Sequence, residues 1–379
     1  MSQKSAELKA QGVDVINLSV GEPDFNTPDH IKEAAKKAVD DNYSRYSPVA
    51  GYPALRKAIV AKLKKENGLD YTPEQIVCSN GAKQCVCNAV MALVSPGEEV
   101  IIPAPYWVSY PQMVLMADGK PVFVEAGIEQ DFKITPAQLE EAITARTKAI
   151  ILCSPSNPTG AVYSQAELEA LAEVLRRHEQ VYIISDEIYE HINYVGSHAS
   201  IARCEGMYDR TIVINGVSKA YAMTGWRIGF CAAPLALAKA CSKLQGQYTS
   251  GPCSVSQVAA TEAFAGPQEC VEEMRQAFER RKELIVRLAR EIPGLEVNEP
   301  HGAFYLFPQC SSYFGKRFGY KVIENSTDFA LYLLEHAHVA TVGGDAFGSP
   351  RCFRMSYATS DENIVEAMHR IKEALAELA

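Results

Sequence analysis

The sequence has no concentrated run of lysine or arginine, and no apolar run long enough to span a membrane. The first absence argues against a nucleic-acid partner, since such partners require clustered positive charge. The second argues against a membrane protein. The N-terminus also lacks the apolar core of a signal peptide. We therefore expect a soluble, cytoplasmic protein of formal net charge −9 that contacts neither nucleic acid nor membrane.

No CxxC pair and no Cys/His ligand spacing is present, although the chain has eleven cysteines. A structural zinc site is therefore not expected, and we predict no bound metal. The cysteines are scattered singly apart from Cys85 and Cys87, and most lie in apolar segments, as Cys78, Cys153 and Cys231 do. Reduced, buried thiols of a cytosolic protein explain this distribution.

There is no internal repeat, and helical and strand patterns alternate through the first three quarters of the 379 residues. From Ile76 the rhythm is strand, polar turn, helix. Helix starts are predicted at Thr27, with Pro28 in the first position, and at two capping boxes that begin at Thr135 and Ser164. Apolar runs without strict alternation, separated by helices, indicate an α/β fold whose mostly parallel sheet is covered on both faces.

The pattern changes near Gly266, where a long charged amphipathic helix begins. Shorter segments follow it and predict a smaller α+β domain, which ends in a helix capped near Ser360. We expect residues 27–280 to form a large domain, and residues 1–26 and 281–379 to form a small one.

A stretch from Val217 to Gly229, VSKAYAMTGWRIG, is the centre of the functional prediction. It follows an apolar run that is typical of a buried strand, so Lys219 is predicted to emerge from the end of that strand. Desolvation there lowers the pKa of a lysine, and its neutral amine can form a Schiff base with an aldehyde. Arg227 lies in a glycine-flanked turn and can bind a phosphate bidentately. An aldehyde and a phosphate on one molecule indicate pyridoxal 5′-phosphate (PLP), although a surface Ser-Lys pair is the commoner meaning of such a dipeptide.

Other polar residues fall at the predicted carboxyl ends of strands, where parallel α/β sheets bind ligands. Asp186 could keep the pyridine nitrogen of the cofactor protonated, or could be a helix N-cap. Tyr189 could donate a hydrogen bond to the phenolate oxygen of the ring, or could be a packed strand-end tyrosine. Asn157 could share that oxygen, or belong to a plain turn.

Gly81 and Ala82 open a helix directly after a strand, which provides an anion site. Lys83 lies in the first turn of that helix, where a cation is unfavourable unless an anion is near; an exposed lysine is the alternative. Trp107, one of two tryptophans, could stack on the ring or pack in the core. Arg354 lies inside an apolar strand and requires an anionic partner, which is either a substrate carboxylate or an internal carboxylate.

Several motifs together resemble the fold type I PLP-dependent aminotransferases of the aspartate aminotransferase superfamily. The resemblance covers nearly the whole chain and includes SVGEPDF, YSPVAGYPALR, NGAKQ, PAPYWVSYP, SPSNPTG, SDEIYE, SKAYAMTGWRIG, GAFYLF and FRMSYATSDEN. The chain is most similar to the bacterial subgroup that includes aspartate and prephenate aminotransferases.

The resemblance implies a role for each candidate residue. Lys219 would hold PLP and then move a proton, with Asp186 at the ring nitrogen and Trp107 stacked on the ring. Tyr189 and Asn157 would touch the phenolate oxygen. The phosphate would be held by Gly81, by the backbone of Ala82 and Lys83, by Ser218 and Arg227, and by Tyr46 of a neighbouring subunit in a homodimer. The substrate would be bound by Gly21, Lys83, Trp107, Asn157 and Arg354.

Two departures from the family pattern bear on these roles. Many members have a serine three residues before the Schiff-base lysine, where this chain has Gly216, so we expect one phosphate contact to be lost or replaced. Relatives also carry a segment before the position of Lys4 that includes a serine or threonine close to the substrate. We expect its absence to weaken recognition of a distal carboxylate and to loosen the contact between domains.

The predicted function is transamination of aspartate or glutamate with 2-oxoglutarate or oxaloacetate. One alternative keeps the reaction but replaces the substrate with prephenate or an aromatic amino acid. A PLP lyase is a second alternative. A PLP-sensing regulator fused to a DNA-binding module is a third, for which we expect no room before Val13. A structural Lys219 in an unrelated α/β protein remains the non-functional alternative.

Overall fold

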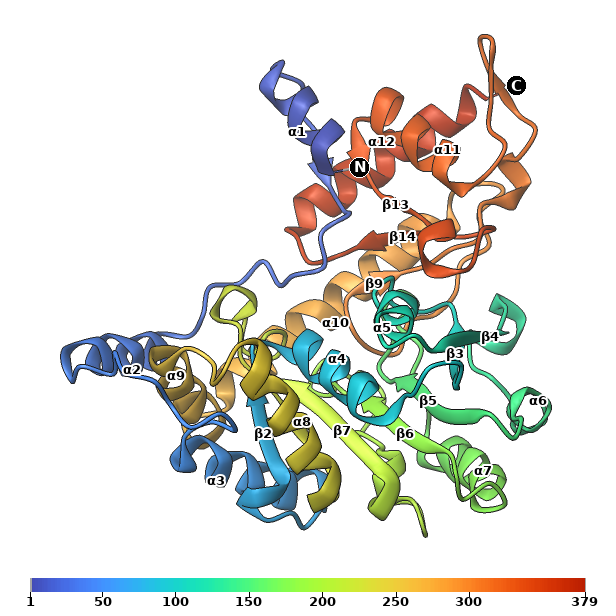
Figure 1. Cartoon of the computed structure of the whole chain (residues 1–379). Coiled ribbons are helices and arrows are strands. Elements are labelled where there is room, and N and C mark those ends of the chain that lie inside the picture. Colours follow the sequence, from blue (N-terminus) through green and yellow to red (C-terminus); the bar gives the residue numbers. More distant parts are fainter. Residues whose placement is uncertain (1, 379) are drawn as a thin grey trace.

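A seven-stranded sheet forms the centre of the structure, a computed structural model that describes residues 2–378 (Figure 1). The strand order is β2-β8-β7-β6-β5-β3-β4, and every neighbouring pair is parallel except those made by β8. The strands are β2 (Ile76–Ser79), β3 (Glu99–Ala104), β4 (Lys120–Glu125), β5 (Thr147–Cys153), β6 (Tyr182–Asp186), β7 (Thr211–Gly216) and β8 (Gly229–Ala232). The predicted mostly parallel α/β sheet is therefore confirmed.

Helices cover both faces of this sheet because its central strands are apolar on both sides. Along β6, Ile183 packs in the cluster around α7 (Gln165–Arg176), whereas the next residue, Ile184, packs in the cluster around α4 (Ala82–Leu93). Buried strands with this pattern read as continuous apolar runs. The other covering helices are α3 (Pro53–Lys62), α5 (Tyr110–Met116), α6 (Pro136–Ala142), α8 (Leu235–Tyr248) and α9 (Ser254–Ala265).

Local sequence signals set most helix starts as predicted. Thr135 and Ser164 accept hydrogen bonds from the backbone N–H of Gln138 and Glu167, and both capping boxes are complete. The start at Thr27 is wrong: α2 (Asp29–Asp40) begins after Pro28, and the side chain of Thr27 makes no cap. Its hydroxyl instead donates to the carbonyl of Ala222 and accepts from the indole of Trp226, because these distant groups compete for it.

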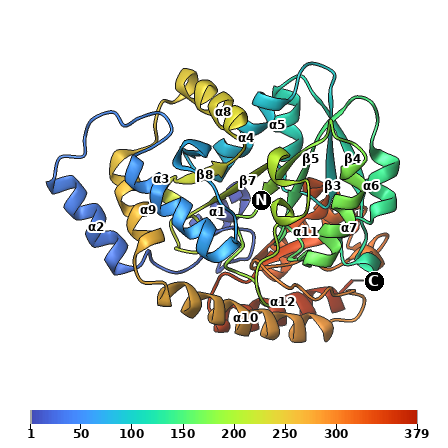
Figure 2. The same cartoon turned by 90° about the horizontal axis from the view of Figure 1, so that it is seen from below.

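The C-terminal part of the chain is built on a long helix, α10 (Glu269–Arg290), which packs beside α12 (Asp361–Ala376) (Figure 2). A three-stranded antiparallel sheet adjoins them, with β14 (Phe353–Ser356) between β13 (Val342–Gly343) and β9 (Tyr305–Leu306). The remaining elements here are α11 (Ser326–Tyr332) and the hairpin of β10 (Arg317–Phe318) and β11 (Lys321–Val322).

The N-terminal segment returns to this C-terminal part. After α1 (Ser2–Ala10), β1 (Ile16–Asn17) pairs in parallel with β12 (Val339–Ala340), and Ile16 and Leu18 join the apolar core around α10 and α12. The chain then runs to α2, which lies beside α9 at the left of the view (Figure 1). Residues 18–26 therefore run past the carboxyl ends of the central strands.

The structure of residues 2–378 bears on two expectations from the sequence, which concern membrane-spanning helices and the state of the cysteines. Across residues 2–378, no helix is both long and apolar enough to cross a membrane. All eleven cysteines are free thiols, and most of them are buried.

Candidate active site

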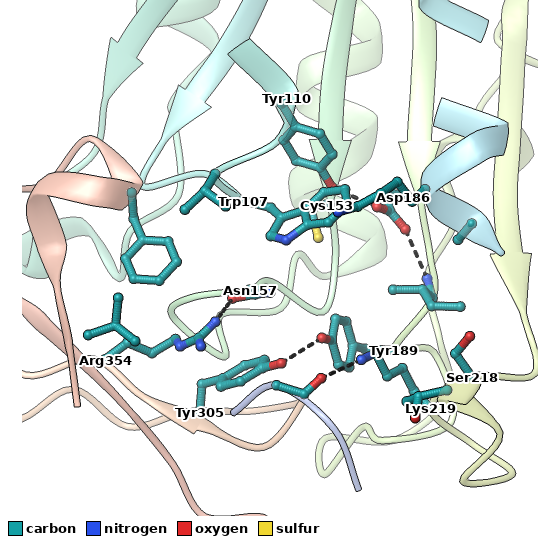
Figure 3. A pocket seen from close by; sticks show the side chains of 18 of the residues that line it. Trp107, Tyr110, Cys153, Asn157, Asp186, Tyr189, Ser218, Lys219, Tyr305 and Arg354 are labelled. Carbon is teal, nitrogen blue, oxygen red and sulfur yellow. Dashed lines mark hydrogen bonds between the residues drawn. The ribbon is translucent and has the colours of Figure 1, made fainter. Parts of the chain in front are cut away.

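A cavity of about 460 Å³ lies where the ends of β5, β6 and β7 meet the C-terminal part and the N-terminal segment (Figure 3). Eleven of the predicted site residues line it, and they come from distant parts of the sequence. They are Gly21, Ala82, Lys83, Trp107, Asn157, Asp186, Tyr189, Ser218, Lys219, Arg227 and Arg354.

Lys219 follows β7 and reaches into this cavity. Its Nζ donates a 2.6 Å hydrogen bond to the carbonyl of Gly21 and lies 5.7 Å from the centre of the Tyr189 ring. Burial lowers the pKa of Lys219 to about 8, and the nearby guanidinium groups of Arg354 and Arg227 act in the same direction. An amine with this pKa is available as a neutral nucleophile near neutral pH, as the sequence predicted.

Asp186 ends β6 and is only 4% exposed. One carboxylate oxygen accepts a 2.6 Å hydrogen bond from the hydroxyl of Tyr110, and the other accepts from the backbone N–H of Ile188 at 3.3 Å. None of the ion pairs among the described residues includes Asp186. Burial without a cationic partner raises the pKa of this carboxyl to about 6. Asp186 is therefore a buried carboxylate that makes no ion pair among the described residues and could pair with a cationic group of a ligand.

Arg227 and the start of α4 form a tight cradle. The guanidinium lies against Gly81, where a Cβ atom would come within 2.8 Å of its Cζ, and Gly81 has a φ of +82°. Gly229 brings β8 equally close: a Cβ there would meet the carbonyl carbon of Gly81 at 2.5 Å and the Cα of Ala82 at 2.8 Å. Backbone N–H groups of a helix start beside a guanidinium suit a phosphate. Glycine suits both positions because a side chain would clash with the Arg227 guanidinium at Gly81 and with the backbone of the helix start at Gly229.

Arg354, on β14, lies on the opposite side of the cavity and is 7% exposed. It donates to Oδ1 of Asn157 at 2.8 Å and to the carbonyl of Ser19 at 2.7 Å. Tyr305 and Phe347 lie beside its guanidinium, with ring centres at 4.6 Å and 4.9 Å. The internal ion pair that the sequence left open does not occur among residues 2–378, so a buried cation faces the cavity with neutral partners only.

Aromatic side chains define the rest of the cavity wall. The hydroxyl of Tyr189 pairs with that of Tyr305 at 2.8 Å, and burial raises the pKa of Tyr189 well above its usual value. Nζ of Lys83 lies 4.9 Å from the centre of the Trp107 ring. Trp107 packs edge-on against Tyr110, whose hydroxyl donates to Asp186. Tyr110 therefore connects the indole ring at the cavity wall to the buried carboxylate.

Two predicted site residues, Gly81 and Tyr46, lie outside the lining. Gly81 contributes only through its contact with Arg227. Tyr46 is 98% exposed in this single chain, and its predicted role concerns a second subunit. Gly216, where we expected a phosphate contact to be lost or replaced, leaves little room for a side chain, because a Cβ would come within 2.8 Å of the Cα of Gly229 and the carbonyl oxygen of Ile228.

The sequence reasoning missed several residues that line the cavity. Tyr110 and Tyr305 hold Asp186 and Tyr189 through their hydroxyl groups, and Phe347 lies beside Arg354. Cys153 pairs across the sheet with Asp186. Its place at the end of β5 was a usable signal, since the strand and its polar turn had been recognised. The tyrosines gave no such signal because their partners are distant in sequence.

Comparison with known proteins identifies the fold family. The family "Aminotransferase class I and II" matches residues 13–371. The chain belongs to this family. It is therefore an aminotransferase, and the resemblance described from its motifs is confirmed.

Its relatives match over almost the full chain. It is 52% identical to an aspartate/prephenate aminotransferase of Cereibacter sphaeroides, covering 100% of this chain and 96% of the relative. It is 50% identical to a bifunctional aspartate aminotransferase and glutamate/aspartate-prephenate aminotransferase of Petunia hybrida, and the match covers 99% of this chain and 79% of the relative. An aspartate aminotransferase structure from Rhizobium meliloti has a TM-score of 0.97 at 46% identity, covering 100% and 95%. The structure of the aspartate aminotransferase of Thermus thermophilus with maleate has a TM-score of 0.92 at 42% identity, and the match covers 98% of this chain and 95% of that chain.

Members of this family are PLP enzymes, and the residues of this cavity fit that cofactor. Asp186 is a buried carboxylate without a cation, which a protonated pyridine nitrogen would supply. At Gly81 and Gly229 no side chain stands between the start of α4 and the Arg227 guanidinium, and both supply donors for a phosphate. Lys219 has the lowered pKa that a reaction with an aldehyde requires.

Proposed function

We propose that this aminotransferase uses PLP to exchange an amino group between aspartate or glutamate and 2-oxoglutarate or oxaloacetate. The observation that carries the proposal is a single cavity that combines a nucleophilic lysine, a buried carboxylate and a buried arginine. Nζ of Lys219 points to Gly21, Asp186 has no cation, and Arg354 has no carboxylate. Each of the three lacks a partner that one bound cofactor and substrate would provide.

In this proposal Trp107 would stack on the ring of the cofactor. Lys219 would bind its aldehyde, Asp186 its ring nitrogen, and Tyr189 with Asn157 its phenolate oxygen. The phosphate would be held by Gly81, by the backbone of Ala82 and Lys83, and by Ser218 and Arg227. When bound, PLP supplies the electron sink that stabilises negative charge at the substrate Cα.

The protein's own groups would then move the proton. The lowered pKa of the Lys219 amine would suit it to accept a proton from the substrate Cα and return it. The Asp186 carboxylate would keep a ring nitrogen protonated. Arg354 binds the substrate α-carboxylate through its fork, with Asn157 and the Gly21 backbone nearby.

The preference for acidic substrates rests on Lys83 and on relatives. Lys83 lies over Trp107 at the cavity wall, where its ammonium could meet a distal carboxylate. Relatives are named for aspartate and prephenate, and one neighbouring structure holds maleate, a dicarboxylate. The second candidate, prephenate as amino acceptor, is supported by the same names.

The assembly and its setting are also proposals. Residues 27–280 would act as the large domain, and residues 1–26 with 281–379 as a small domain that closes over Arg354 and excludes water. The exposed Tyr46 would reach the phosphate of the neighbouring subunit in a homodimer. Eleven free thiols support a cytoplasmic location, where cysteines stay reduced.

A half-reaction titration tests the proposal. Aspartate, glutamate, tyrosine, alanine and arogenate would each be added to the PLP-loaded enzyme while its visible absorbance is followed. We expect rapid bleaching with aspartate and glutamate, lost for both in Lys83→Ala. An equal response to alanine would overturn the acidic preference. Failure of borohydride to fix PLP on Lys219 would overturn the cofactor assignment itself.

A further inference from the structure

A second set of charged side chains lies behind Asp186, the last residue of β6, and Tyr189, in the turn that follows it. Asp186 and Tyr189 line the cavity, whereas Glu187 and Glu190 do not. Both glutamates are buried, with exposures of 2% and 5%. The turn therefore carries functional side chains on one side and buried carboxylates on the other.

Glu187 makes three hydrogen bonds through its carboxylate. One oxygen accepts from the hydroxyl groups of Ser185 at 2.8 Å and Ser200 at 2.7 Å. The other lies 2.8 Å from Nε2 of His198, whose side chain is 8% exposed. The backbone N–H of Glu187 donates to the carbonyl of Ile214 on β7 at 2.8 Å. These bonds fix the backbone directly after Asp186.

His198 belongs to a group of neighbouring charged side chains, and its proton affects the net charge of that group. Glu190 pairs with the buried Lys62 and accepts from Asn67, and Glu66 is shared between Lys62 and His191. A carboxylate oxygen of Glu187, a carboxylate oxygen of Glu190 and an imidazole nitrogen of His198 all lie within 4.8 Å of one another. These six charged side chains comprise three carboxylates, one lysine and two histidines. They balance only when both histidines are protonated, and unbalanced buried charge is costly.

We propose that the Glu187–His198 pair positions Asp186: it holds the turn that carries this carboxylate, and its net charge sets the electrostatic potential there. The inference rests on the proposed function, since Asp186 acts on the ring nitrogen of PLP. Glu187 and His198 touch neither cofactor nor substrate, so they are positioning residues.

The electrostatic effect has a definite sign. Burial lowers the pKa of His198, but the Glu187 carboxylate outweighs it, and the pKa of His198 lies above its usual value. The charge of Glu187 also adds to burial in raising the pKa of Asp186. While His198 is protonated, it cancels this charge. Loss of the His198 proton adds negative potential behind Asp186 and stabilises a protonated ring nitrogen.

The proton on His198 can exchange with solvent from the far side of the turn. His198 lines a second cavity, of about 720 Å³, which shares no lining residue with the active site. The other charged or titratable groups that line it are Lys133, Tyr163, Glu167, Arg203 and His301, and Lys133 is paired with Glu167. The pair thus links this cavity to the active site through Asp186.

The first test follows the histidine imidazole signals of the apoenzyme by NMR as the pH is raised. The His198 signal is assigned from its loss in His198→Gln. We expect a midpoint above 6.5 in the wild type and a midpoint at or below 6.5 in Glu187→Gln. The matched control is His178→Gln, which removes a half-buried histidine paired with Glu140 at 2.8 Å and should leave the His198 midpoint unchanged. A wild-type midpoint at or below 6.5 overturns the proposal even if Glu187→Gln does not fold.

The second test uses enzyme loaded with PLP that is ¹⁵N-labelled at the ring nitrogen. In the wild type, we expect the ring ¹⁵N shift to change in one step at the His198 midpoint. This step should vanish in His198→Gln and persist in His178→Gln. A ring signal without a step that depends on His198 overturns this inference and leaves the proposed function standing. Failure of PLP to bind overturns the proposed function, and the inference with it.

Discussion

Gly229 offers a sharp test of the phosphate cradle, because it holds strand β8 against the first residues of helix α4. In Gly229→Ala, the new methyl group would lie 2.5 Å from the carbonyl carbon of Gly81 and 2.8 Å from the Cα of Ala82. Both are backbone atoms, so neither can rotate away. The strand and the helix must separate, which moves Arg227 relative to the N–H groups of the helix start.

The size of the effect follows from the cost of overpacking. Inserting a methylene into a packed site costs about 1–3 kcal/mol. If that cost falls on the geometry that binds phosphate, affinity for PLP weakens roughly 5- to 150-fold. Calorimetric titration of the apoenzyme with PLP measures this, and inorganic phosphate as a competitor reports the cradle alone.

The matched control lies four residues earlier in the same turn. A methyl group added at Gly225 would have no atom within 4 Å, and the backbone there is not left-handed, so Gly225→Ala should bind PLP within about twofold of the wild type. If Gly229→Ala also binds PLP that tightly, the close approach of β8 is not what shapes the cradle.

Three further predictions concern the charged groups of the cavity. Burial raises the pKa of Asp186 from 3.8 to about 6, so its contribution to apoenzyme stability is present below pH 4 and lost as the pH rises through 6. At pH 7, the Asp186→Asn apoenzyme should therefore have a free energy of unfolding up to about 3 kcal/mol above that of the wild type, seen as a higher urea midpoint, while transamination is lost. Equal urea midpoints would contradict this. Because the pKa of Lys219 is about 8, stopped-flow rates of PLP attachment should rise about tenfold per pH unit below pH 8 and level off above it; a continued rise to pH 10 would refute that value. Arg354→Lys loses the bidentate fork and should raise the KM of amino acid and keto acid about tenfold or more, with kcat less affected; an unchanged KM would exclude Arg354 from carboxylate binding.

Much of the fold and the site could be predicted because the relevant signals are local. The capping boxes at Thr135 and Ser164 depend on residues three positions apart, and both formed as predicted. Thr27 had an equally good local signal, but its hydroxyl binds Ala222, which is 195 residues away. A local rule fails when a distant group offers the same atom a better partner.

The sequence by itself determined the chemistry of the site: which residue types stand at the ends of parallel strands, and therefore that Lys219, Asp186 and Asn157 would converge. Only the tertiary structure decided what surrounds them. It paired Tyr110 with Asp186, left Arg354 with neutral partners, and placed Glu187 and His198 behind the turn. The physical reason is that the periodicity of apolar residues along the chain shows where each strand ends. Burial and charge pairing, in contrast, arise only when distant segments pack together.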